Sequence, residues 1–158
     1  MLQQTQVKTV IPYFIKFVSK IPNLEVLSTS NEKKILKLWE GLGYYRRAKN
    51  LHKTSKILIK KYNGKIPKSF EKLKELPGIG DYTANVLLAL IYNQPRVALD
   101  GNVKRVLSRL DNINTEETVN LFRTKRNGDF AEALMEFGAL ICKPKNPVCY
   151  ECKIKKMC

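Results

Sequence analysis

Apolar side chains recur along this chain every three to four residues, the spacing that gathers them on one face of an α-helix. Strict alternation of apolar and polar residues, which is typical of strands, is nearly absent. The sequence therefore predicts an all-α fold. The expected helices are residues 7–18, 31–40, 46–62, 70–75, 81–91, 101–110, 115–122 and 130–141.

Short polar residues mark where several of these helices should begin. Ser30, Asp100 and Asp129 are each expected to be an N-cap, because a short side-chain oxygen can accept a hydrogen bond from a backbone amide of the first turn. The side chains expected to face inward on the last helix are Phe130, Ala133, Leu134, Phe137 and Leu140.

The charge of the chain is strongly positive. Its 29 Lys and Arg residues outnumber its 14 Asp and Glu residues, giving a formal net charge of +15. This excess favours a polyanionic partner such as nucleic acid, although an AT-rich genome can also enrich lysine. No apolar run reaches the ~18 residues of a membrane-spanning helix, and the first residues do not form a signal peptide.

All four cysteines lie at the end of the chain, in a C-x6-C-x2-C-x5-C arrangement. A disulfide framework is disfavoured, because the rest of the chain lacks cysteine and this fits a reducing compartment. Tetrahedral zinc usually shows two close pairs of ligands. An iron–sulfur cluster also takes four thiolates and tolerates uneven loops. The spacing alone leaves zinc and iron–sulfur both open.

The segment Leu76-Pro-Gly-Ile-Gly80 lies between two expected helices. Gly78 and Gly80 allow backbone conformations barred to other residues and let a ligand approach the backbone closely. Amides at the start of the second helix would then form a site for a DNA phosphate. The alternative is a plain helix–helix turn ending in a glycine cap.

Asp100 has a structural and a chemical interpretation. As an N-cap it has a sufficient structural role, but a carboxylate at a helix start can also stabilise positive charge on a sugar ring. Lys104 and Arg105 follow one turn later and are expected to contact phosphates. His52, the single histidine, is interpreted as a surface or packing residue.

Taken together, the hairpin at residues 76–80, the Leu99-Asp-Gly-Asn-Val103 segment and the cysteine pattern resemble the helix-hairpin-helix DNA glycosylases of the endonuclease III superfamily. Within that superfamily, three stretches resemble the adenine DNA glycosylases: residues 1–7, residues 41–52 and residues 99–106. The resemblance covers nearly the whole chain.

The resemblance implies a [4Fe–4S] cofactor bound by four cysteines: Cys142, Cys149, Cys152 and Cys158. In this family the cluster shapes a basic DNA-contacting loop, in which Lys143 and Lys145 fall. The implied partner is double-stranded DNA that contains A·8-oxoguanine or A·G mispairs. A monomer without membrane contact is expected, in a bacterial-type cytoplasm in association with the nucleoid.

The resemblance also implies a monofunctional reaction, in which adenine is flipped out of the duplex and released. Asp100 would stabilise the oxocarbenium-like sugar, with support from Asn102. Tyr82 stands where endonuclease III has its Schiff-base lysine, so no β-lyase step is expected. Gln4 and Tyr44 match residues that wedge into the duplex, and Glu132 is a further weak candidate.

The chain departs from that family at both ends. There the catalytic glutamate lies just ahead of the segment that here starts at Met1, and a domain reading 8-oxoguanine follows the last cluster ligand. We therefore expect a chain truncated at both ends. If Met1 is the true start, we expect adenine excision to be lost while DNA binding partly survives.

The expected architecture has a helical lobe at residues 1–98, with the helix-hairpin-helix at about 69–91, and a cluster lobe at residues 99–158, with its iron–sulfur loop at 142–158. DNA would lie in the groove between the lobes. Two alternatives to an adenine glycosylase remain. One is a thymine or uracil mismatch glycosylase, and the other is a non-catalytic DNA-binding module with a structural cluster.

Overall fold

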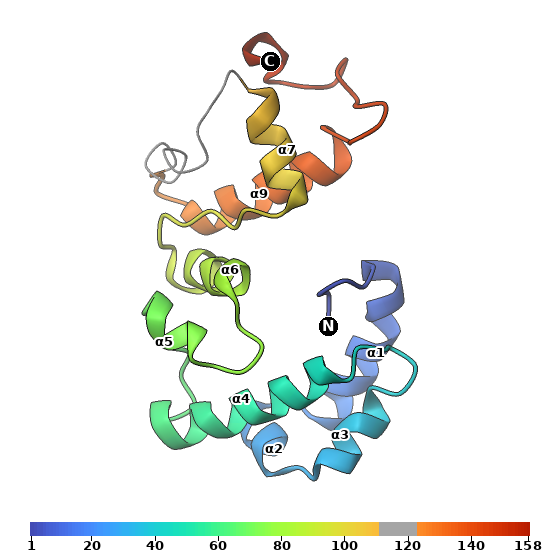
Figure 1. Cartoon of the computed structure of the whole chain (residues 1–158), viewed down its shortest axis with the longest axis vertical. Coiled ribbons are helices and arrows are strands. Elements are labelled where there is room, and N and C mark those ends of the chain that lie inside the picture. The colour runs from blue at the N-terminus through green and yellow to red at the C-terminus, as the bar shows by residue number, and fades with distance from the viewer. Residues whose placement is uncertain (111–122) are drawn as a thin grey trace. The chain divides into compact units, whose positions relative to one another are not determined.

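The computed structural model describes residues 1–110 and 123–158, and every regular element in this part of the chain is helical (Figure 1). The expected helix at residues 115–122 lies outside the described residues. The elements are α1 Val7–Lys20, α2 Leu24–Thr29, α3 Glu32–Leu38, α4 Arg46–Tyr62, α5 Phe70–Lys74, α6 Asp81–Tyr92, α7 Gly101–Arg109, α9 Asn127–Leu140 and the short 3-10 helix η1 Lys155–Met157.

The chain divides into two compact units. The first comprises Met1–Pro67 and Lys72–Gly78, and the second comprises Lys68–Glu71 and Ile79–Cys158. These units differ in extent from the lobes 1–98 and 99–158, which stay a prediction. Among the described residues, no helix is both long and apolar enough to cross a bilayer.

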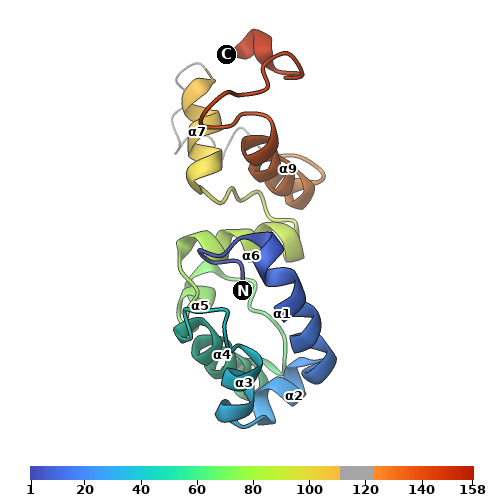
Figure 2. The same ribbon diagram turned by 90° about the vertical axis from the view of Figure 1, so that its right-hand side faces the viewer.

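The first unit is built around α4, which packs against α2 and α3, while α1 packs against α3 (Figure 2). Its core centres on Trp39, which is 1% exposed and meets the ring of Phe17 edge-on at a centroid distance of 6.0 Å. Full burial of a large apolar side chain contributes about 1.5–3 kcal/mol. Of the apolar positions on α1, Val10 and Phe17 join this core.

Five further apolar side chains of α1 face outward. They are 40–61% exposed, although they share the helical spacing of core residues, and comprise Val7, Ile11, Phe14, Ile15 and Val18.

The N-caps of α3 and α9 differ from those expected from the sequence. Asn31, not Ser30, caps α3 by accepting a hydrogen bond from the Lys33 amide at 2.9 Å. Ser30 instead ends α2, a six-residue helix that the sequence pattern missed. Asp129 lies inside the first turn of α9 and pairs with Arg126, because the helix already begins at Asn127.

The second unit is organised by α9, which packs against α6 and α7. Two glycines make this packing close: a Cβ at Gly128 would lie 2.9 Å from the Ala89 carbonyl oxygen, and one at Gly138 would lie 2.8 Å from the Asn102 Cβ. The prediction that Ala133 and Leu140 face inward on α9 is wrong, since both side chains are exposed.

Candidate functional site

Asp100 is the N-cap of α7, as predicted. Its Oδ1 accepts a hydrogen bond from the Val103 amide at 2.7 Å, and its Oδ2 accepts one from the Asn102 side-chain amide at 3.3 Å. Both bonds fix the direction of the carboxylate at the positive end of the helix dipole. A half-buried carboxylate held in this way can face a developing cation without reorganising.

Arg105 joins this carboxylate site to the cysteine segment. It donates from Nη2 to the Asn102 Oδ1 at 2.9 Å and to the Gly138 carbonyl at 2.6 Å, and from Nε to the Cys142 carbonyl at 2.8 Å. The predicted phosphate contact therefore competes with bonds inside the protein. Lys104, its neighbour on α7, is exposed.

Tyr82, at the start of α6, lies near Asp100 within the second unit. Its hydroxyl donates to the Met135 sulfur at 3.3 Å. Burial, and secondarily the negative charge of Asp100, raise the pKa of Tyr82 above its ordinary value. The phenol consequently stays neutral at physiological pH and is a hydrogen-bond donor rather than an anionic nucleophile.

Residues of α4 contact the Pro77-Gly78 turn of the helix-hairpin-helix segment. Thr54 donates from Oγ1 to the Pro77 carbonyl at 2.9 Å, and a Cβ at Gly78 would lie 2.9 Å from the Asn50 Cβ. Gly78 has φ +81°, so the fold does require glycine there. Gly80 is extended, with φ −95° and ψ −176°, and no atom of the described residues lies within 4 Å of the position that a Cβ would take there. Of the two glycines, Gly80 has the open space that would let a ligand approach the backbone closely, whereas Gly78 is crowded by Asn50.

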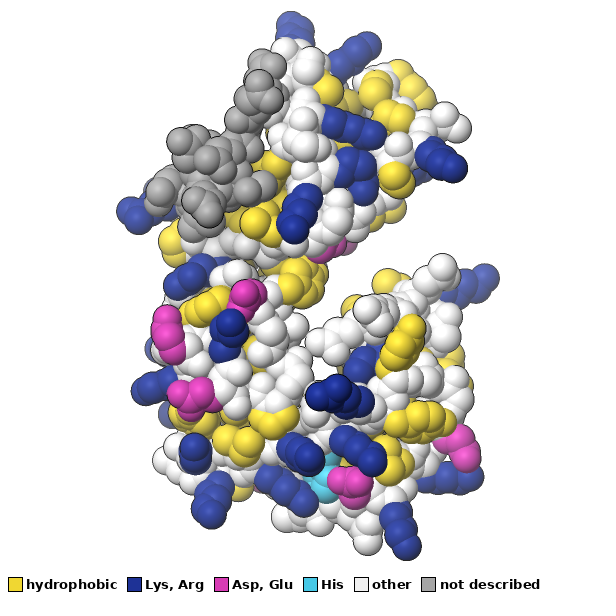
Figure 3. Space-filling view, in the orientation of Figure 1, with side chains coloured by type: hydrophobic (Ala, Val, Ile, Leu, Met, Phe, Trp, Pro, Cys, Tyr) yellow, Lys and Arg dark blue, Asp and Glu magenta, His cyan; other side chains and the backbone are white. Residues whose placement is uncertain are grey.

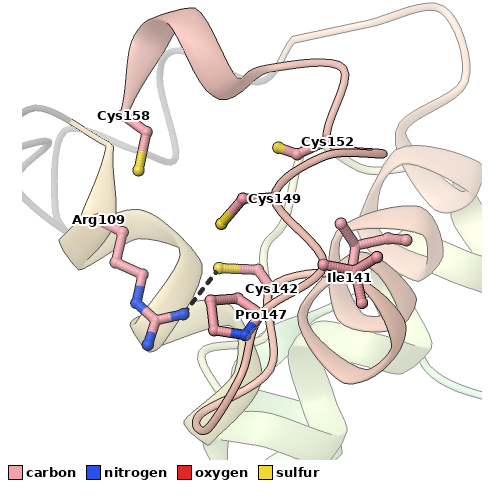
Figure 4. Close-up of a pocket in the computed structure, with 8 residues that line it drawn as sticks. Arg109, Ile141, Cys142, Pro147, Cys149, Cys152 and Cys158 are labelled. Atoms are coloured by element: carbon pink, nitrogen blue, oxygen red, sulfur yellow. Dashed lines mark hydrogen bonds between the residues drawn. The ribbon is translucent and has the colours of Figure 1, made fainter.

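The four cysteines line one pocket of about 350 Å³ (Figure 4). All four are free cysteines in the structure. In the described part of the chain, no three potential ligand residues are close enough to hold a single metal ion. Four cysteines that line one pocket are a donor set that suits an iron–sulfur cluster, which four thiolates ligate.

Arg109, the last residue of α7, holds this pocket together and was not among the residues expected from the sequence. It donates from Nη1 to the Cys142 sulfur at 3.2 Å and to the Lys143 carbonyl at 2.9 Å, and from Nη2 to the Pro144 carbonyl at 3.3 Å. Its spacing of four residues from Arg105 was the available signal, because such residues share a helix face. Lys143 and Lys145 are exposed.

The remaining candidate residues divide into exposed and buried side chains. Gln4 and Tyr44 are both exposed and both have left-handed backbones, with φ of +57° and +49°. Glu132 is exposed on α9.

His52 is 2% exposed and is therefore a packing residue. Burial, and then the nearby Lys56, lower its pKa below the ordinary value. Figure 3 shows Lys and Arg side chains spread over both units.

Comparison with known proteins identifies the class to which this fold and site belong. The model of the HhH-GPD superfamily of base excision DNA repair proteins matches residues 1–128, and the chain belongs to this superfamily. The membership confirms the resemblance drawn from the hairpin and from Asp100. Endonuclease III-like members of the superfamily usually carry an iron–sulfur cluster.

The individual relatives are more specific. An adenine DNA glycosylase of Buchnera aphidicola subsp. Baizongia pistaciae is 46% identical over 171 residues, which cover 100% of this chain and 48% of that protein. The chain thus spans about half the length of the bacterial relatives that it matches.

Two solved structures share the fold. A thermostable thymine-DNA glycosylase matches with a TM-score of 0.86 at 27% identity, and the match covers 99% of this chain and 78% of that one. The endonuclease III of a non-covalent DNA complex matches with a TM-score of 0.82 at 26% identity, with the same two coverages.

Proposed function

We propose that the chain supplies the DNA-binding hairpin and the catalytic carboxylate of an adenine DNA glycosylase that acts on A·8-oxoguanine or A·G mispairs in duplex DNA. The observation that carries this proposal is the Asp100 carboxylate, fixed by Val103 and Asn102 beside the neutral phenol of Tyr82. Identity along the whole chain to adenine DNA glycosylases supports the choice of base.

In this proposal Asp100 stabilises the oxocarbenium-like sugar as the bond to adenine breaks. Asn102 is a positioning residue that orients the carboxylate through its side-chain amide. Tyr82 offers no amine for a Schiff base, so the reaction ends with base release and without strand cleavage.

DNA is held by groups that do not depend on base sequence. Amides near Gly78 and Gly80, at the start of α6, face a backbone phosphate. The exposed Lys104, Lys143 and Lys145 add positive charge. Arg105 contributes less to DNA binding than the sequence predicted, because several of its N–H groups already donate to groups of the protein. Binding should therefore weaken steeply as salt rises.

The pocket lined by the four cysteines is proposed to hold a [4Fe–4S] cluster through Cys142, Cys149, Cys152 and Cys158. When bound, the cluster would supply four iron–thiolate bonds that order the basic loop. Arg105 and Arg109 already tie that loop to α7, so the same loop positions Lys143 and Lys145 for DNA.

A thymine mismatch glycosylase is the second candidate. Tyr82 suits either enzyme, and the thermostable thymine-DNA glycosylase shares the fold at a TM-score of 0.86.

Base release and binding separate these candidates. Binding is measured on the chain with duplexes containing A·8-oxoguanine, T·G or only A·T. Release is measured on the chain and on a chimera that adds the flanking segments of the Buchnera relative, because the chain spans about half of it. We expect preferred binding of A·8-oxoguanine, and adenine release by the chimera that Asp100→Asn lowers by about 10²-fold or more.

Each other outcome is informative. Release of thymine from T·G, with none of adenine, would favour the mismatch glycosylase. Binding of all duplexes alike, with no release by the chimera, would favour a non-catalytic DNA-binding module.

A further inference from the structure

Arg47, in the first turn of α4, connects two segments that are distant in the sequence. Its guanidinium donates to the carbonyl oxygens of Met1 and Gln3 in the first segment. It also donates to the carbonyls of Gly43 at 3.2 Å and Leu42 at 3.5 Å in the second. One side chain thus fixes both backbones to α4.

Two aromatic rings hold this guanidinium in place. Its central carbon lies 5.1 Å from the centroid of the Tyr44 ring and 5.6 Å from that of the Trp39 ring, within the range of cation–π attraction. Trp39 is buried and donates from Nε1 to the same Gly43 carbonyl at 3.1 Å. The hydrophobic core of the first unit therefore anchors Arg47.

Each connected segment carries an exposed side chain on a strained backbone. Gln4 and Tyr44 are in the left-handed region, which costs a non-glycine residue about 1–3 kcal/mol and persists only when its surroundings enforce it. The Arg47 bonds provide such enforcement on both sides. Gln3 adds a bond from Nε2 to the Gly78 carbonyl at 3.4 Å, which connects the first segment to the hairpin.

We propose that Arg47 is a positioning residue that holds Gln4 and Tyr44 together as one recognition element for the base opposite the excised adenine. The Tyr44 ring is 59% exposed and offers a face on which a base can stack, and the Gln4 amide offers a donor and an acceptor for a base edge. This inference rests on the proposed function.

Arginine suits this role better than lysine. Its planar fork presents donors in fixed directions, so it can serve carbonyls on two sides while its face contacts an aromatic ring. A lysine would keep the charge but bind fewer of the four carbonyls.

The matched variants are Arg47→Gln, Arg47→Lys and the control Arg46→Gln, which removes the same charge from an exposed neighbour. The readout is the ratio of Kd for an A·T duplex to Kd for an A·8-oxoguanine duplex, at several salt concentrations. We expect Arg47→Gln to lower this ratio about tenfold and to leave the salt slope unchanged. Arg46→Gln should weaken both complexes equally and make the slope shallower.

Two further measurements separate positioning from general stabilisation. Amide exchange of Thr5, whose N–H donates to the Leu2 carbonyl at 3.2 Å, should accelerate in Arg47→Gln but not in Arg46→Gln. In a double-mutant cycle, Arg47→Lys should lower the ratio less in the Tyr44→Ala background than in the wild type, because Arg47 then positions Gln4 alone. Arg47→Lys is the deciding variant if Arg47→Gln does not fold.

An unchanged ratio in variants that fold, beside a clear preference in the wild-type chain, would overturn the role of Arg47 and leave the proposed function standing. Additive losses in the cycle would do the same. A wild-type chain that binds both duplexes alike would overturn both proposals.

Discussion

Arg105 donates a 2.8 Å hydrogen bond from Nε to the carbonyl oxygen of Cys142, which fixes the middle of α7 to the first cysteine of the pocket. The same guanidinium bonds Asn102, and Asn102 bonds Asp100. Three consecutive hydrogen bonds therefore connect the candidate catalytic carboxylate with the cysteine segment. Disturbance at either end should be detectable at the other.

Replacing Arg105 with Gln should weaken both ends of this connection. Hydrogen bonds to a charged group contribute about 1.5–3 kcal/mol each, so the thermal midpoint should fall by several degrees. If the pocket binds the proposed [4Fe–4S] cluster, absorption near 400 nm per mole of protein should fall as well, because the cysteine loop loses its attachment at Cys142. Lys104→Gln is the matched control, and equal iron content in both variants would contradict the prediction.

Replacing Arg109 with Gln should act more locally. The variant loses the bond to the Cys142 sulfur, and hydrogen bonds to ligand sulfurs help to set the reduction potential of an iron–sulfur cluster. For the proposed cluster we expect a lower reduction potential, measured by voltammetry, and faster loss of iron to a chelator. Arg109→Lys should restore part of both properties; a potential equal to that of the wild type in Arg109→Gln would refute the role.

The raised pKa of Tyr82 predicts a pH dependence of stability. The unfolded phenol titrates near its ordinary value of 10.0, and the folded phenol titrates higher, so the folded state holds the proton more tightly. This contribution is complete below pH 10 and disappears as the pH rises through the folded pKa. Denaturation by urea across pH 8–12 should show a steeper alkaline loss in the wild type than in Tyr82→Phe. Equal slopes would mean that the pKa of Tyr82 is not raised by folding.

Thr54→Val should loosen the hairpin. The change leaves the Pro77 carbonyl without its donor and should cost about 1 kcal/mol of stability. Because the hairpin is expected to bind backbone phosphate, affinity should fall several-fold for every duplex, whatever its sequence. Fluorescence anisotropy with matched and mismatched duplexes measures this. Thr54→Ser keeps the hydroxyl and serves as the control; a loss confined to the mispaired duplex would argue against phosphate binding.

The sequence predicted the features that depend on local chemistry. The cap at Asp100, the turn glycine at Gly78 and the neighbouring helices all follow from the spacing of nearby residues. Short elements were less predictable: α2 has six residues, too few for a clear apolar period, and missing it moved the expected cap from Asn31 to Ser30.

The features that the sequence could not predict depend on contacts across long separations. Arg47 binds the carbonyls of residues 44 and 46 positions away, and Arg109 binds Cys142 from 33 positions away. For Arg109 the four-residue spacing from Arg105 is a local signal, but for Arg47 no local pattern distinguishes an arginine that binds protein carbonyls from one that faces solvent.

Gly138 is a position where a substitution should impair the protein although the residue carries no reactive group. A methyl group at this position would meet the Cβ of Asn102 at 2.8 Å, and the backbone of Asn102 almost as closely. The displaced Asn102 is the residue that orients Asp100. A single-nucleotide change that replaces Gly138 by Ala should therefore have an effect close to that of replacing Asp100 in its proposed role, although Gly138 is buried, uncharged and on another helix.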